Sequence, residues 1–402
     1  MISGIIKAIM TFVGLPMPVD FTLLSALFLS IDIVLYSMRR RGKIDLNIKL
    51  EVIPILLLFM FYFWLLITSI YTASTEYGYV KAVYFLLNIL AFLYPIIIKD
   101  FNLRRFVRWL IGLILIFSLL FLPFHLLVSS SGLLQQLYSA EELEVISGHY
   151  LSLGELAGFC LVFLIGDSAK DYFPKYLLYI LKLLFLVILL GLGARGPLLF
   201  ALIVVVFILL SKRYFFGFRS PKRSLFIGGL SFLTLGLLIF QFWDYLYPLF
   251  ENTFRRLEIL ANSAFDSSTN DNSIGERYEH FRFTSNYIFD NFFDFLFGQG
   301  VGSYGILFKG FDVRFYPHNI VLELLFEFGL IGLLLFGIWF GTTLINFNIT
   351  VIRFSFFWCL IFSCLNLLKS NSLVDIRLFF GTLAVLIIVL QKSNQGEREI
   401  LN

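Results

Sequence analysis

The stretch that decides the fold is residues 107–128, VRWLIGLILIFSLLFLPFHLLV, which contains one basic residue, Arg108, and no acidic one. A helix needs roughly 20 mainly apolar residues to cross a bilayer. Of the 402 residues 59% are hydrophobic and 14% are charged, whereas a soluble domain carries about 25% charged residues. Comparable stretches recur along the chain, at about 20–38, 51–71, 81–98, 151–167, 176–192, 197–211, 224–243, 319–341, 354–368 and 375–391.

We therefore predict an all-α fold, a polytopic transmembrane helical bundle with 11 spans, or 12 if the short apolar segment 5–15 also crosses. Residues 1–402 are expected to form a single membrane domain. Basic residues collect in alternate loops, which the positive-inside rule places in the cytoplasm together with the C-terminal tail. These loops carry Arg39, Arg40, Arg41 and Lys43; Lys99, Arg104, Arg105 and Arg108; and Lys212, Arg213, Arg219, Lys222 and Arg223.

One long polar segment, residues 244–317, falls on the opposite, non-cytoplasmic side and is expected to be structured. Ser273 and Glu276 match a capping box, the pattern that satisfies free N–H groups at the start of a helix. We predict an amphipathic helix over about 274–293, lying on the membrane or capping a cavity. Its apolar positions at near-helical spacing are Tyr278, Phe281, Ile288, Phe292 and Phe295.

Nucleic acid is not an expected partner, because the net charge is only +4 and no basic patch is interleaved with aromatic residues. The three cysteines, Cys160, Cys359 and Cys364, lie in apolar segments. Their positions suit small packing residues and provide neither a disulfide framework nor a metal-binding spacing. No metal or cofactor is expected.

His318 is the first candidate for chemistry, because Pro317 precedes it and an apolar helix follows. Proline suits a first helical turn, and the positive end of the helix dipole would lower the pKa of the imidazole. A neutral imidazole near pH 7 can act as a general base; the alternative is an interfacial histidine without a role. Glycines on the same helix at 329, 332, 337 and 341 would allow close helix packing.

Asn319, Glu323 and Glu327 follow four residues apart and form one polar stripe on this helix. Carboxylates inside a membrane are costly and are candidates for function by default. The alternative is that they pair with a polar group on a neighbouring helix, which we favour for Glu327.

Arg195 and Arg277 are candidates for binding an anion, with Arg282 close to the second in sequence. The planar guanidinium fits phosphate oxygens with two parallel hydrogen bonds. Glycines on both sides of Arg195 would let a ligand approach closely; binding of a lipid headgroup is an equally good interpretation. We interpret the segment 298–303, GQGVGS, as a turn, because it does not follow a strand as a phosphate-binding glycine loop would.

The stretch 317–332, PHNIVLELLFEFGLIG, resembles the signature of the O-antigen polymerase and ligase superfamily, in which His-Asn precedes Gly-x-x-Gly. The matching residues are His318, Asn319, Gly329 and Gly332. The segment 298–303 is similar to the glycine-rich segment of that family, and Arg195 and Arg277 resemble its two arginines. The order and rough spacing of these elements agree, so the resemblance extends over most of the chain.

The resemblance implies a metal-independent membrane glycosyltransferase of the GT-C type, without a cofactor. Its donor would be an undecaprenyl-diphosphate-linked oligosaccharide. His318 would activate the acceptor hydroxyl, Arg195, Arg277 and Arg282 would hold the diphosphate, and Asn319 and Glu323 would support the site. The protein would lie in the bacterial inner membrane with its active site facing the periplasm, and a chain-length regulator protein is a further expected partner.

Three functions remain open on the sequence. A polymerase joins repeat units on the carrier lipid, and a ligase moves finished glycan to lipid A core. We favour the polymerase, because the outer loop is modest and no dedicated acceptor domain is visible. A transporter or flippase for lipid-linked glycans would be expected to show internal repeats or charges spread over several spans, whereas here the polar groups concentrate at one end.

Overall fold

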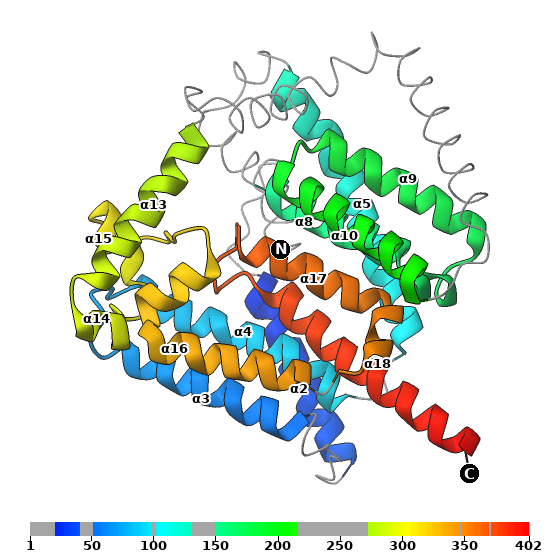
Figure 1. Cartoon of the computed structure of the whole chain (residues 1–402), viewed down its shortest axis with the longest axis horizontal. Coiled ribbons are helices and arrows are strands. Elements are labelled where there is room, and N and C mark those ends of the chain that lie inside the picture. The colour runs from blue at the N-terminus through cyan, green and yellow to red at the C-terminus, as the bar shows by residue number, and fades with distance from the viewer. Residues whose placement is uncertain are drawn as a thin grey trace. The chain divides into compact units, whose positions relative to one another are not determined.

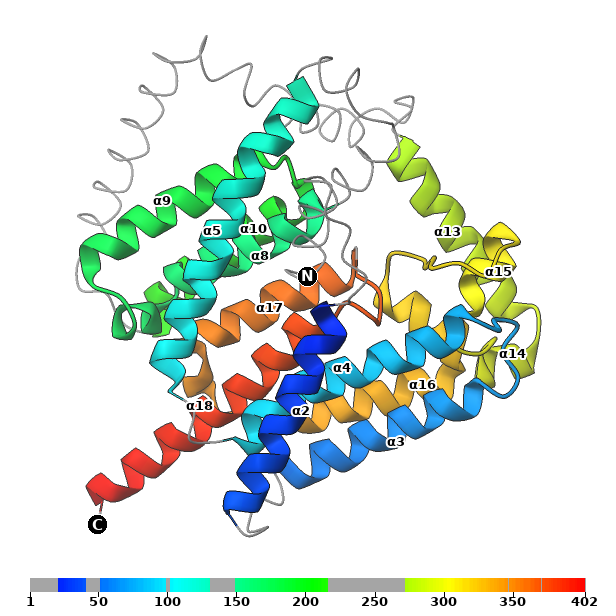
Figure 2. The same ribbon diagram turned by 180° about the vertical axis from the view of Figure 1, so that it is seen from behind.

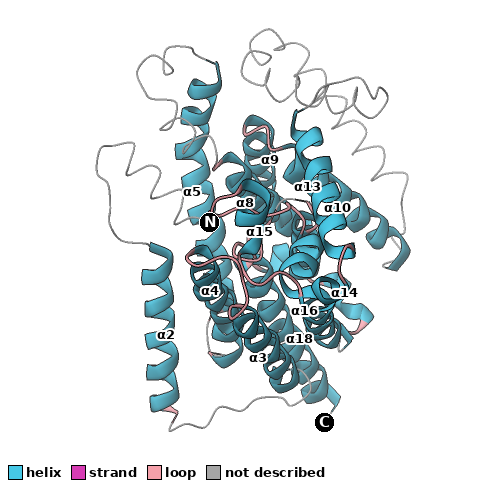
Figure 3. Ribbon diagram, turned by 90° about the vertical axis from the view of Figure 1, so that its left-hand side faces the viewer, coloured by secondary structure: helices cyan, strands magenta, loops and turns pink. Residues whose placement is uncertain are grey.

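The structure is a computed structural model that describes residues 21–40, 51–98, 102–130, 149–215, 272–345, 347–369 and 371–401. Within these ranges all regular structure is helical and no strand occurs (Figure 3). The α-helices are α2 (Phe21–Arg39), α3 (Ile53–Thr68), α4 (Tyr77–Ile97), α5 (Leu103–Ser130), α8 (Tyr150–Ile165), α9 (Lys175–Gly191), α10 (Arg195–Phe215), α13 (Asn272–Phe289), α14 (Phe292–Phe297), α15 (Ser303–Lys309), α16 (Ile320–Ile345), α17 (Ser355–Leu367) and α18 (Arg377–Leu401).

The prediction of a polytopic helical membrane protein is confirmed. The helices α2, α4, α5 and α16 are long and apolar enough to cross a bilayer. Shorter apolar helices are Ile53–Thr68, Tyr150–Ile165, Arg195–Ser211 and Ser355–Leu367. Each span predicted within the described ranges coincides with a helix. The predicted span 224–243 and the short segment 5–15 lie outside the described residues.

The chain divides into two compact units, which are described separately. The first comprises residues 1–19, 103–269 and 352–362, and its described helices are α5, α8, α9, α10 and the start of α17. Helix α8 is buried along most of its length. Two glycines permit this, because a side chain at Gly154 would strike Ala194 and one at Gly158 would strike the ring of Phe362.

The second unit comprises residues 20–102, 270–351 and 363–402. Helix α3 packs against α16, and α4 packs against α18 (Figure 1). The core between them is aromatic, with rings in edge-to-face contact, the geometry that the aromatic quadrupole favours. The ring centroids of Phe61 and Phe85 are 5.3 Å apart, and those of Phe92 and Trp339 are 5.7 Å apart.

Helix α16 is broken at Gly329, whose φ of 66° lies in the left-handed region. The glycine-rich segment 298–302 occupies the break, and a Cβ at Gly329 would meet the Leu296 carbonyl at 2.3 Å. Carbonyls at a helix end need partners, and here donors from outside α16 supply them. The bonds are Gln299 N–H to Phe326 O at 2.8 Å, Gly300 N–H to Glu327 O at 2.9 Å, and Trp64 Nε1–H to Phe328 O at 3.0 Å.

These contacts confirm the interpretation of residues 298–303 as a turn and revise that of the α16 glycines. Gly329 forms the break itself, whereas a Cβ at Gly332 would meet Phe328 at 2.2 Å and Trp64 of α3 at 3.3 Å. Among the described residues, nothing lies within 4 Å of a Cβ added at Gly337 or Gly341. Close packing is thus seen at Gly329, against α14, and at Gly332, against α3, whereas the described part of the chain shows none at Gly337 and Gly341.

The predicted helix in the polar loop is present as α13, which begins at Asn272, one residue before the predicted cap Ser273, and ends at Phe289. Of the predicted apolar positions on α13, Tyr278 and Phe281 are exposed and Ile288 is buried. The buried positions of α13 are His280, Thr284 and Ile288. The chain breaks after Phe289, where Asn291 caps the separate helix α14, so one helical period does not extend to Phe292 and Phe295.

Candidate functional site

His318 lies at the N-terminus of α16, directly before the residue that caps the helix. Helix α16 starts at Ile320, and Asn319 is its cap: the Asn319 Oδ1 accepts hydrogen bonds from Val321 N–H at 2.9 Å and Leu322 N–H at 3.2 Å. Pro317 likewise precedes the helix. His318 has a φ of 54°, a left-handed conformation that costs a non-glycine residue about 1–2 kcal/mol.

A second histidine, His280 on α13, lies beside His318. Their ring centroids are 5.5 Å apart in an edge-to-face arrangement. His280 is buried, and its Nδ1 is 2.8 Å from the hydroxyl of Tyr304 on α15. The ring of Tyr316 also contacts His318, with the two ring centroids 4.5 Å apart. Two histidines and two tyrosines thus come together from α13, α15 and the segment ahead of α16.

The surroundings of His280 are strongly positive. Burial, together with the smaller effects of His318, Lys309 and Arg277, lowers the pKa of His280 to about 4. Because these three groups act on one imidazole, they mark a common positive region formed by three separate segments. We call Arg277, His280, Lys309 and His318 the basic cluster. Near neutral pH the positive charge of this cluster comes from Arg277 and Lys309, because a pKa of about 4 leaves His280 neutral. These two charges are suited to an anionic ligand.

Arg277 and Arg282 lie on different faces of α13. Both are exposed on α13. Arg277 is three residues before His280 and lies on the same side of the helix, whereas Arg282 is two residues after it. At about 100° per residue, Arg282 lies on nearly the opposite face from His280. The structure therefore places Arg277, and not Arg282, in the basic cluster.

Arg195 is in the first unit, where it is the first residue of α10. Gly193 provides the left-handed turn between α9 and α10, with a φ of 62°. The adjacent Ala194 packs directly against Gly154 on α8. Arg195 is half-buried at the start of its helix, as expected for a residue at the end of a span.

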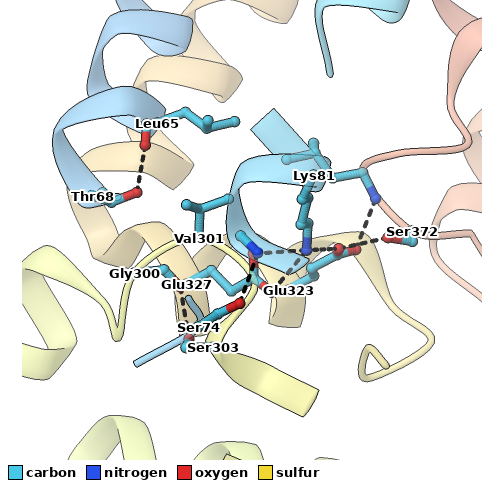
Figure 4. A network of polar contacts seen from close by, with 12 residues as sticks. Leu65, Thr68, Ser74, Lys81, Gly300, Val301, Ser303, Glu323, Glu327 and Ser372 are labelled. Carbon is cyan, nitrogen blue, oxygen red and sulfur yellow. Dashed lines mark hydrogen bonds and ion pairs between the residues drawn. The ribbon is translucent and has the colours of Figure 1, made fainter. Parts of the chain in front are cut away.

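Glu323 and Glu327 form a buried ion cluster with Lys81 of α4 (Figure 4). All three side chains are fully buried, and the Lys81 ammonium lies 2.7 Å from the Glu327 carboxylate. Glu323 also accepts hydrogen bonds from the Ser372 hydroxyl at 2.7 Å and from Leu373 N–H at 2.9 Å. Both carboxylates thus have partners on a neighbouring helix, the alternative that the sequence analysis favoured for Glu327.

The segment between α15 and α16 is held to the start of α4 by Asp312. Its carboxylate accepts hydrogen bonds from the Ser74 hydroxyl at 2.6 Å and from the backbone N–H groups of Thr75 and Glu76 at 2.8 Å. Burial opposes ionisation, but these bonds outweigh it and lower the pKa of Asp312. Further along the segment, Arg314 pairs with Asp375 ahead of α18. Both anchors hold the chain on the N-terminal side of His318.

Three residues of this region, Lys81, His280 and Lys309, were not predicted from the sequence. Lys81 carried a signal, since a lysine within an apolar span needs a partner inside the membrane. His280 is three residues after Arg277 on a helix that was predicted, and this spacing could have identified it. Lys309 carried no signal, because only the folding of α15 against α13 brings it there.

The helices and their composition define a multi-pass integral membrane protein. Residues 180–337 match the family described as O-antigen ligase, a range that includes Arg195, Arg277, Arg282, His318, Asn319 and Glu323. The matched range covers about two fifths of the 402-residue chain and supports the resemblance to the O-antigen polymerase and ligase superfamily. The family indicates a function of the O-antigen ligase or polymerase type, a glycosyltransferase-like enzyme that acts on lipid-linked glycans in membranes. No curated protein matches the chain.

Proposed function

We propose that the protein is an O-antigen or polysaccharide polymerase of the GT-C type in the bacterial inner membrane. It transfers glycan from an undecaprenyl-diphosphate donor to a sugar hydroxyl of a lipid-linked repeat unit, at a site facing the periplasm. The observation that carries the proposal is the placement of His318, in a strained backbone conformation, inside the basic cluster. Strained residues cluster at active sites.

In the proposed reaction the acceptor hydroxyl oxygen attacks the anomeric carbon of the donor sugar. The bond from that carbon to the diphosphate oxygen breaks, and undecaprenyl diphosphate leaves with the electron pair. His318 takes the hydroxyl proton as general base. Charge develops on the departing diphosphate, where Arg277 stabilises it without needing a metal ion. For Arg195, which lies in the other unit, the same role is proposed from the family resemblance alone.

The other proposed site residues contribute to the reaction in different ways. Asn319 supports His318 by capping α16 directly after it. Glu323 acts at a distance, through its bonds to Lys81 and to the turn at Ser372. Arg282 faces away from His280, so we assign it a weaker contact with the donor than Arg277. A chain-length regulator is the protein partner that such a polymerase would use.

The proposal is tested in a strain that lacks this protein, complemented with the wild type or with His318→Ala. We expect the variant to reach wild-type levels in the membrane but to give single repeat units on the surface without a polymer ladder. A matched control is His125→Ala, since His125 stacks between Phe121 and Tyr150 in the other unit. A normal ladder from a normally expressed His318→Ala variant would rule out the general-base role.

The same experiment separates the two alternatives. Finished polymer that accumulates on the carrier lipid at the outer face would identify a ligase, which shares the family and the site. Intermediates trapped on the cytoplasmic side would identify a transporter of lipid-linked glycans. A transporter would also tolerate His318→Ala, because it transfers no sugar.

A further inference from the structure

Helix α14 exposes an unusual number of aromatic side chains for six residues. Phe292 and Phe293 are 69% and 67% exposed, and Phe289 at the end of α13 is 72% exposed. Phe293 and Phe297 stack with centroids 6.2 Å apart, so the rings form a continuous surface. We call this surface, together with two residues that follow α3, the aromatic collar: Phe289, Phe292, Phe293, Phe297, Ile70 and Tyr71.

The collar is attached firmly at the end of α3 within the second unit. Figures 1 and 2 show α14 beside the ends of α3 and α16. The Tyr71 hydroxyl donates a hydrogen bond of 2.7 Å to the Phe297 carbonyl, and the Trp64 ring lies 6.1 Å from the Phe297 ring. The turn after α14 is bonded into the break of α16. The exposed rings therefore belong to a rigid part of the bundle.

The collar continues the apolar outer face of α3. That face is a single stripe with spacings of three and four residues, and it leads directly to Ile70, which is 83% exposed. The stripe consists of Leu56, Phe59, Phe63, Leu66 and Ile70. Because α3 is an apolar helix of a membrane protein, this stripe is the side that meets the acyl chains of the lipid.

The length of α3 gives a second, independent argument. Its 16 residues span about 24 Å at 1.5 Å per residue, whereas the hydrocarbon core of a bilayer is about 30 Å thick. Apolar surface that continues beyond Thr68 would make up this difference, and the collar lies at that position. The collar also provides both halves of an interfacial surface, since aromatic rings alternate with the polar side chains of Asp290, Asn291 and Asp294.

We propose that α14 is immersed in the bilayer, at the boundary between the acyl chains and the headgroups, and that the aromatic collar is a lipid-binding surface. The polar loop thus returns to the membrane between Phe289 and Phe297 before the chain enters the break in α16. Helix α13, with Arg277, then rises from the membrane surface at a fixed point. This proposal concerns a surface outside the basic cluster and does not depend on the proposed reaction.

The proposal is tested with Phe292→Cys and Phe293→Cys in a Cys364→Ala background, because Cys364 is the half-buried native thiol and Cys160 and Cys359 are buried. Each variant is labelled with a fluorescent maleimide in detergent and reconstituted into phosphatidylcholine vesicles with or without dibrominated phosphatidylcholine. We expect severalfold stronger quenching by the brominated lipid than at Tyr278→Cys, an equally exposed position on α13.

A membrane-impermeant maleimide applied to cells or vesicles gives the second readout. We expect it to label Tyr278→Cys and to leave Phe292→Cys and Phe293→Cys unmodified until detergent is added. Equal quenching and equal labelling at all three positions would place α14 in water and overturn the proposal. Failure of both α14 variants to label in detergent would show that protein covers the collar, which also overturns it.

Discussion

The Lys81 ammonium and the Glu327 carboxylate lie 2.7 Å apart, with no solvent access to either side chain. Glu323 completes the cluster from the same helix as Glu327, one turn nearer its N-terminus. The three residues fasten α4 to α16 at the level of the helix break. They also connect the turn at Ser372, because its hydroxyl bonds to Glu323. The cluster therefore holds in place the N-terminal part of α16, which His318 and Asn319 directly precede.

We predict that Lys81→Met strongly destabilises the protein, because it leaves two buried carboxylates without their cation. Removal of one partner from a buried ion pair costs about 3–5 kcal/mol. The measurement is thermal unfolding of the purified protein in detergent, with the amount in the membrane as a second readout. The triple variant Lys81→Met, Glu323→Gln, Glu327→Gln should recover much of the loss, and an unchanged melting temperature for Lys81→Met alone would contradict the prediction.

Gly329→Ala is predicted to disrupt the junction between α16 and the glycine-rich turn. An alanine there must adopt a left-handed φ, at about 1–2 kcal/mol, and its Cβ would meet the Leu296 carbonyl at 2.3 Å. We expect loss of activity together with a lower melting temperature. Gly337→Ala is the matched control on the same helix, since nothing lies within 4 Å of its added Cβ; helix propensity predicts a gain of about 0.5–1 kcal/mol there. Equal effects of the two substitutions would show that the break is not needed.

His280 should make the protein sensitive to mild acid. Its pKa falls from the usual 6.5 to about 4 in the folded protein, so the unfolded chain binds the proton first as the pH decreases. Stability from this group is complete above about pH 6.5 and is lost as the pH falls toward 4. The difference in melting temperature between wild type and His280→Gln should therefore change across this range. His125→Gln serves as the control, and a constant difference for His280→Gln would refute the assignment.

Arg195→Lys and Arg277→Lys are predicted to impair polymer formation by tenfold or more. A lysine keeps the charge but cannot reproduce the two parallel hydrogen bonds of a guanidinium to phosphate oxygens. The measurement is the surface-glycan ladder at matched protein levels in the membrane. Arg282→Lys should be milder, because Arg282 lies on nearly the opposite face of α13 from His280. Near-normal polymer with Arg195→Lys would reduce that residue to a headgroup contact.

Much of the fold could be predicted because helix formation in a membrane depends mainly on the local sequence. A bilayer leaves backbone groups no partner except within a helix, so a run of apolar residues determines both the helix and its approximate ends. This is why α2, α8 and α9 lie close to their predicted ranges. The same reasoning placed a helix in the polar loop, where the capping pattern near Ser273 marked its start.

The sequence by itself thus determined the helical membrane fold, the turn at 298–303 and the residues of the family signature, all of which depend on neighbours in the chain. The tertiary structure alone decided three further relationships. Lys81 became the partner of Glu323 and Glu327 because α4 and α16 pack together, and His280 and Lys309 joined His318 because α13 and α15 fold against the start of α16. Gly329 became a helix break because the turn after α14 supplies donors for the carbonyls beside it. Such contacts join residues distant in the chain, and only packing brings them within reach.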